Sequence, residues 1–103
     1  MLFLEWSDPA KEEVKKIYDW NIRNYSVGRA RKILLSIKKI TRKIPSQPYA
    51  HPQCKEIEKP SHEIRNALVE RTYWIIYKIK IDRIIIVGIF HGAMNPETYK
   101  NLK

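Results

Sequence analysis

The sequence predicts an α+β domain in which a helical hairpin packs on a mostly antiparallel sheet, in the order β-α-α-β-β-β. Two long stretches between residues 8 and 44 carry apolar residues at helical spacing. Three runs between residues 64 and 90 are rich in β-branched and aromatic residues, which favour strands. Helices followed by strands, rather than alternating with them, are typical of the α+β class.

The N-terminal half contains signals for one short strand and two helices. A strand is expected over residues 2–6. Ser7-Asp8-Pro9 predicts a helix start, because a side-chain oxygen caps free N–H groups and proline suits the first turn. Ser26-Val27-Gly28 interrupts the spacing and begins a second helix, which Ile44-Pro45 ends. The connection is short, so we expect the helices to form an antiparallel hairpin. Their apolar faces are Ala10, Val14, Ile17, Tyr18, Ile22 and Tyr25, then Ala30, Ile33, Leu34, Ile37, Ile40 and Ile44.

The C-terminal half is predicted to form the rest of the sheet. Residues 45–62 contain four prolines and little periodicity, which predicts an irregular connection. Strands are expected over 64–69, 73–81 and 84–90, with a tight turn at Asp82-Arg83. The last run does not alternate, which is typical of a strand covered on both faces, so Ile85 and Val87 are both expected to be buried. Asn95-Pro96-Glu97 is expected to cap a final helical turn around Tyr99.

Length and composition predict one domain over residues 1–103 of a soluble cytoplasmic protein. The chain has 103 residues and is 44% hydrophobic, which is enough to build one core. Its single cysteine excludes an internal disulfide framework. The longest apolar run covers residues 84–90, far short of the ~20 residues of a membrane span, so no membrane partner is expected.

The positive charge of the chain is concentrated in one segment. Twenty lysines and arginines against eleven acidic residues give a net charge of +9. No acidic residue occurs between Asp19 and Glu56, a stretch with nine basic residues. This excess favours a polyanion or an acidic protein as partner, and a solvated basic face is the alternative. The candidate binding residues on the second helix are Arg31, Lys38, Lys39, Arg42 and Lys43.

The motifs predict neither a metal site nor a cofactor. His51-x-x-Cys54 and His62 are residue types that zinc accepts, but the paired ligand spacing and a fourth ligand are missing. No glycine-rich phosphate loop or nucleophile elbow is present. His91, directly after the last strand, is either a proton carrier or a hydrogen-bonded residue that closes the sheet end. Arg65 is either a phosphate ligand or a surface residue.

Five features in a fixed order carry a family resemblance. They are the Trp6 strand, the hairpin that ends in Ile44-Pro45, the segment YWIIYKI at 73–79, the Asp82-Arg83 turn, and IIIVGIFHG at 84–92. With these features the chain resembles the RelE/ParE superfamily of type II toxin–antitoxin toxins over almost its whole length. The segment at 73–77 looks like the family's Tyr-Arg-aliphatic-aliphatic-Tyr strand. The segment at 91–96 resembles the His-Gly-x-Arg-(Asn/Asp)-Pro end of ParE-like members.

The resemblance implies two different activities for the two branches of the superfamily. RelE-like members are ribosome-dependent mRNA endonucleases whose cationic cluster stabilises the charge of the transition state. At the positions of that cluster this chain has Trp74, Met94 and Ala67, and only Arg65 keeps a charge. His91 and Tyr99 would be its proton carriers. ParE-like members are similar in fold and inhibit DNA gyrase instead.

The depleted cationic set and the match at 91–96 favour the ParE-like branch. We therefore expect a growth-inhibiting toxin with no catalysis of its own and no cofactor, neutralised by a cognate antitoxin in a hetero-oligomer. Family antitoxins wrap a C-terminal segment across the toxin, which the basic second helix would suit. One alternative is a RelE-like endonuclease that uses Arg65, His91 and Tyr99. The other is a non-toxic basic nucleic-acid-binding domain.

Overall fold

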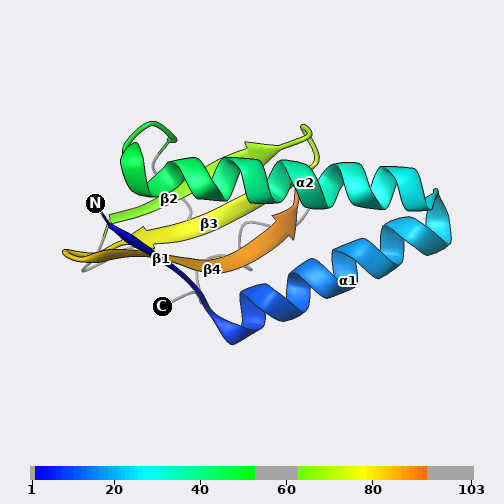
Figure 1. Ribbon diagram of the computed structural model, residues 1–103, viewed down its shortest axis with the longest axis horizontal. Helices are drawn as coiled ribbons and strands as arrows, with labels where there is room; N and C mark the ends of the chain where they lie inside the picture. The colour runs from blue at the N-terminus through cyan, green and yellow to red at the C-terminus, as the bar shows by residue number, and fades with distance from the viewer. Residues whose placement is uncertain (1, 53–62, 93–103) are drawn as a thin grey trace.

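The computed structural model describes residues 2–52 and 63–92, in which two helices pack on one side of a four-stranded sheet (Figure 1). This arrangement confirms the predicted α+β class and element order. In chain order the elements are β1 (Phe3–Trp6), α1 (Asp8–Asn24), α2 (Val27–Lys43), a 3-10 turn (Ile44–Ser46), β2 (Glu63–Val69), β3 (Tyr73–Ile79) and β4 (Arg83–His91).

Serine caps start both helices, as the sequence predicts. The Ser7 hydroxyl accepts a hydrogen bond from the Ala10 N–H at 3.2 Å, and the Ser26 hydroxyl accepts one from the Arg29 N–H at 3.1 Å. Each cap satisfies a backbone donor that the first helical turn leaves without a partner. At the other end of α2, Pro45 lies inside the 3-10 turn that terminates the helix. The hairpin therefore has the expected limits.

The strand order is β1-β4-β3-β2, so the first described strand lies beside the last described one. β2 with β3 and β3 with β4 are antiparallel pairs, whereas β1 runs parallel to β4. Leu4 is paired with Ile84 and Trp6 with Ile86. The sheet is mixed but mostly antiparallel, in agreement with the prediction.

A β-bulge in β4 explains why its apolar run does not alternate. Ile76 is paired with Gly88 and the next residue, Tyr77, with Ile86, so Val87 has no direct opposite in β3. An extra residue reverses the alternation of side chains along a strand. Ile86 before the bulge and Ile89 after it therefore both belong to the main core under the helices.

Two expectations for the strands are corrected by the structure. Val87 is buried, with 9% of its surface exposed, but Ile85 is only half-buried at the edge of a smaller cluster on the other face of the sheet. β3 ends at Ile79 rather than at residue 81, because Lys80 and the 99% exposed Ile81 belong to the turn before β4. β-branched residues favour strands, but the turn at Asp82 decides where the pairing stops.

The main core lies between the helices and the sheet and consists mostly of isoleucine. Tyr77, Ile75, Ile84 and Ile86 are fully buried at its centre. Asn21 links α1 to this core, because its amide donates to the Ile17 carbonyl at 2.8 Å and to the Tyr73 hydroxyl at 3.1 Å. Neither helix is long and apolar enough to cross a membrane.

Several sequence predictions lie outside the described residues. These are the helical turn at Asn95-Pro96-Glu97, the candidate proton carrier Tyr99, and Met94, Cys54 and His62.

The two faces of β4 predict unequal costs for neighbouring truncations. Ile86→Ala removes a fully buried side chain and leaves a cavity, so it should lower the free energy of unfolding by about 3–4 kcal/mol. Ile85→Ala on the half-buried face should cost about 1–2 kcal/mol. Urea denaturation of the two variants measures both values, and equal losses would contradict the assignment of faces.

Candidate functional site

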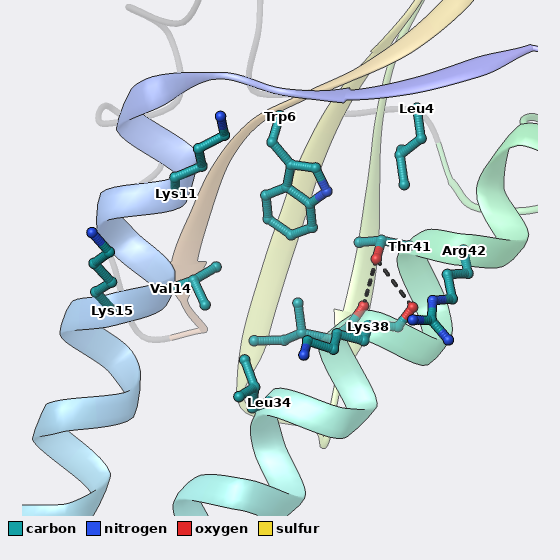
Figure 2. Close-up of a pocket in the computed structure, with 10 residues that line it drawn as sticks. Leu4, Trp6, Lys11, Val14, Lys15, Leu34, Lys38, Thr41 and Arg42 are labelled. Atoms are coloured by element: carbon teal, nitrogen blue, oxygen red, sulfur yellow. Dashed lines mark hydrogen bonds between the residues drawn. The ribbon is translucent and has the colours of Figure 1, made fainter.

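A groove of about 370 Å³ opens between the two helices on the side where β1 ends (Figure 2). β1 supplies Leu4 and Trp6, which project into the space between α1 and α2. Val14 faces it from α1 and Leu34 from α2. The described lining is Leu4, Trp6, Lys11, Val14, Lys15, Leu34, Ile37, Lys38, Thr41 and Arg42.

The helical repeat places the lining residues of α2 in one row. Leu34, Lys38 and Arg42 are four residues apart, which is the spacing of neighbours on one helix face. Thr41 beside them is buried, and its hydroxyl donates to the Ile37 carbonyl at 2.8 Å and lies 3.2 Å from the Lys38 carbonyl. Because that hydroxyl is satisfied within the helix, the wall of the groove stays apolar.

Four cations stand around this apolar floor. Lys11 and Lys15 come from α1, Lys38 and Arg42 come from α2, and all four are exposed. No described lining residue is acidic. Lys15 makes an ion pair with Glu12 at 3.9 Å, but both side chains are mostly exposed, so this pair offsets little of the charge. The groove is therefore shaped for an apolar ridge flanked by negative charge.

The groove contains only part of the predicted basic site. Lys38 and Arg42 line it, whereas Arg31, Lys39 and Lys43 are exposed on other parts of α2. Sequence analysis missed Lys11 and Lys15 because acidic neighbours on α1 lower the local net charge of this segment. Their four-residue spacing around Val14 was the available signal.

Arg65, the remaining cation of the nuclease hypothesis, attaches the segment after the 3-10 turn to the sheet. Its Nη1 donates to the His51 carbonyl at 2.7 Å and to the Tyr49 carbonyl at 3.3 Å. Its guanidinium also lies 4.8 Å from the centre of the Tyr49 ring. Beside it the Tyr77 hydroxyl donates to the Pro48 carbonyl at 2.7 Å. This arginine has a structural role in the fold.

His91 lies at the other end of the sheet, in the wall of a second cavity of about 370 Å³. Its ring packs edge-on against Tyr73, with the ring centres 5.7 Å apart. Ile17 and Trp20 of α1 line the same cavity. The bulge in β4 accounts for this placement, because it turns His91 to the helix side together with Ile89.

Comparison with known proteins identifies the family. The family model described as the ParE toxin of the type II toxin–antitoxin system parDE matches residues 4–96. The chain belongs to this family. Its fold is similar to a solved structure described as a chromosomal ParDE toxin–antitoxin system from P. aeruginosa, with a TM-score of 0.74 and 20% sequence identity over 88% of this chain and 96% of that chain. Among curated proteins, none gives a significant sequence match.

Membership of the ParE toxin family confirms the predicted resemblance to RelE/ParE toxins. The chain is thus the toxin component of a type II toxin–antitoxin system, and an antitoxin is its expected partner. In this ParE-family toxin the described part of the chain contains no group of three residues able to hold a metal ion.

The two described residues of the nuclease hypothesis, Arg65 and His91, are not brought together in this ParE-family toxin. Arg65 is paired with Tyr77 and His91 with Tyr73, so they are four residues apart along β3 and on opposite sides of it. Strand dimensions then place their Cα atoms roughly 17 Å apart. The other two described positions are uncharged: Trp74 packs on the opposite face of the sheet and Ala67 is buried in the core.

The burial of Tyr77 predicts that the stability of the fold changes with pH in the alkaline range. Burial raises the pKa of Tyr77 to about 12, and the nearby Arg65 offsets only part of this effect. Because the pKa of Tyr77 is higher in the folded protein than its unfolded value near 10, the protonated phenol contributes stability that is fully present below pH 10. This contribution is lost as the pH rises towards 12. Between pH 10 and 12 the free energy of unfolding should therefore fall more steeply for the wild type than for Tyr77→Phe. Denaturant titrations at several pH values measure this difference. If the free energy of unfolding falls equally with pH in both proteins, the raised pKa of Tyr77 is contradicted.

Proposed function

We propose that this ParE-family toxin inhibits a protein target of the DNA gyrase type without catalysis of its own, and that its antitoxin neutralises it by docking in the groove between α1 and α2. The single observation that carries the antitoxin site is the groove itself, with an apolar floor and four cations at its rim. The cytoplasm is the location that we propose for this activity, because a gyrase-type target acts on DNA there.

The chemistry of the groove favours an amphipathic antitoxin segment. Apolar anchors at helical spacing fill a groove of this kind, which is a recurrent mode of peptide recognition. Acidic residues beside those anchors would face Lys11 and Lys15 on one side and Lys38 and Arg42 on the other. Charge complementarity of this type accelerates association and fixes the register of the bound segment.

The inhibitor hypothesis is supported by the separation of the two described nuclease candidates, Arg65 and His91. General acid–base catalysis needs groups within hydrogen-bond reach of the same substrate atoms. Arg65 and His91 are separated by strand β3, and the Nη1 of Arg65 is occupied by two backbone carbonyls. A toxin that acts by binding needs no such convergence.

The groove predicts that antitoxin affinity depends on where the basic residues lie on α2, and not on the net charge alone. The double variant Lys38→Glu/Arg42→Glu reverses two rim charges and should weaken antitoxin binding at least about tenfold, with a flatter salt dependence. The control is Arg31→Glu/Lys43→Glu, which makes the same charge change on the same helix outside the groove. Each pair includes one residue of the last helical turn, so the helix-dipole cost is matched.

This prediction is measured by isothermal titration calorimetry with the antitoxin encoded beside the toxin gene, at two salt concentrations. Equal weakening by both double variants would mean that the net charge attracts the antitoxin and that the groove does not seat it. Unchanged affinity in both would remove the electrostatic docking idea.

Replacement of His91 distinguishes an inhibitor from a nuclease. A nuclease that relies on His91 for proton transfer should lose ~10²–10⁴-fold activity in His91→Ala while it stays folded. We expect instead that the wild type inhibits gyrase supercoiling, leaves mRNA on translating ribosomes intact, and responds to His91→Ala by a modest change. Supercoiling and mRNA-cleavage assays run in parallel measure both activities. Cleavage by the wild type that disappears in the folded variant would refute the inhibitor proposal.

A further inference from the structure

The end of α1 and the turn that follows it carry large aromatic side chains that belong to neither core cluster. The turn between α1 and α2 projects past the end of the sheet (Figure 1). Trp20 is 43% exposed and Tyr25 is 61% exposed. Arg29, on the first turn of α2, is exposed beside them. We refer to Trp20, Tyr25 and Arg29 as the tip cluster.

The three side chains of the tip cluster hold one another in place. The rings of Trp20 and Tyr25 meet edge to face, with centres 5.6 Å apart and planes inclined by 61°. The Arg29 guanidinium lies over the Tyr25 ring, 4.7 Å from its centre. The backbone beneath is fixed as well, since the Asn24 amide donates to the Trp20 carbonyl at 2.8 Å and the Tyr25 N–H to the Asn21 carbonyl at 2.9 Å.

Such a cluster has the composition and the order of a binding hot spot. Tryptophan, tyrosine and arginine are the residues that most often dominate the free energy of a protein interface. Side chains that are already ordered in the free protein lose little entropy on binding. Neither ring belongs to a core cluster, so the contact between them is not part of the core packing.

The charge around the tip cluster selects an acidic partner. Arg23 and Arg31 are exposed and lie two residues from Tyr25 and Arg29 in the sequence, which contains no acidic residue from position 20 to position 55. The adjacent acid, Asp19, lines a different recess with Val14 and Leu34, on the side of α1 that faces α2. Glu13 lines the His91 cavity together with Trp20, but its charge is paired with Lys16 at 3.6 Å and adds little net charge.

We propose that the tip cluster is the surface through which the toxin binds an acidic patch on its protein target. This inference rests on the proposed function of the chain as a protein inhibitor. The tip cluster shares no described residue with the antitoxin groove, so the two surfaces can be separated by mutation. The inclined rings, with Arg29 over one face of Tyr25, also fit a protein recess better than a strand of nucleic acid, whose bases stack on open ring faces.

The chain provides a matched control for the aromatic residue. Tyr49 is 60% exposed and has Arg65 at 4.8 Å over its ring, so it reproduces both the exposure and the cation contact of Tyr25. Tyr25→Ala should weaken binding to intact gyrase at least about tenfold and reduce growth arrest, whereas Tyr49→Ala should change neither. Both variants should keep wild-type affinity for the antitoxin.

A charge reversal in the tip cluster tests the acidic partner without harming the helix. Arg29→Glu puts glutamate three residues after the helix cap Ser26, which is the capping-box pattern that stabilises a helix start. The folded protein should therefore be retained while binding to gyrase falls at least about tenfold. Thermal unfolding of each variant provides the control for folding.

The outcomes separate the inference from the function on which it rests. If the wild type inhibits gyrase and Tyr25→Ala and Arg29→Glu do so equally well, the inference is wrong and the proposed function stands. If the wild type does not bind gyrase, the proposed target is wrong, and growth arrest decides the inference: loss in both tip variants but not in Tyr49→Ala supports it, and full arrest in all three overturns it. Loss of antitoxin binding, or of binding to a labelled single-stranded oligonucleotide, in the tip variants would also overturn it.

Discussion

The parallel pairing of β1 with β4 is the interaction on which the groove depends. It joins Phe3–Trp6 to residues 83–86, and each residue of β1 is paired with the residue 80 positions later in the chain. The pairing continues past the strand, because the Ser7 N–H donates to the Ile86 carbonyl at 3.0 Å and the same residue caps α1. The start of α1 is thus fixed to the central part of the sheet, and Leu4 and Trp6 are held where they line the space between the helices.

Local features of the fold were predictable from sequence, and the non-local ones were not. Ser7 and Ser26 act within three residues of themselves, so each cap can be identified in a short window. The neighbour of β1 is decided by which strand the whole chain brings alongside it. The bulge at Val87 is equally hidden, because an apolar run of isoleucine and valine is compatible with burial on both faces as well as with a change of face. For this reason the sequence predicts burial of Ile85, whereas the structure leaves it half-buried.

The candidate site shows the same limit. Net charge on α2 pointed to Lys38 and Arg42, but a groove needs a second wall and a floor, and those come from α1 and β1. The nuclease hypothesis combines Arg65 and His91 because both resemble residues of the RelE-like nucleases. Their separation follows from the register of β3 between β2 and β4, which no residue pattern within a single strand reveals.

The groove and the tip cluster differ in whether their side chains are stabilised before a partner binds. In the groove, four cations surround an apolar floor, so the free protein has both mutual repulsion between like charges and exposed apolar surface. A bound acidic amphipathic segment relieves both, and any ligand that binds only the folded state also stabilises it. The tip cluster is already ordered by contacts among its own three side chains. In the function that we propose, the groove is therefore the surface that the antitoxin occupies in the resting complex. The tip cluster is, in the same proposal, a surface that is already ordered before the target binds.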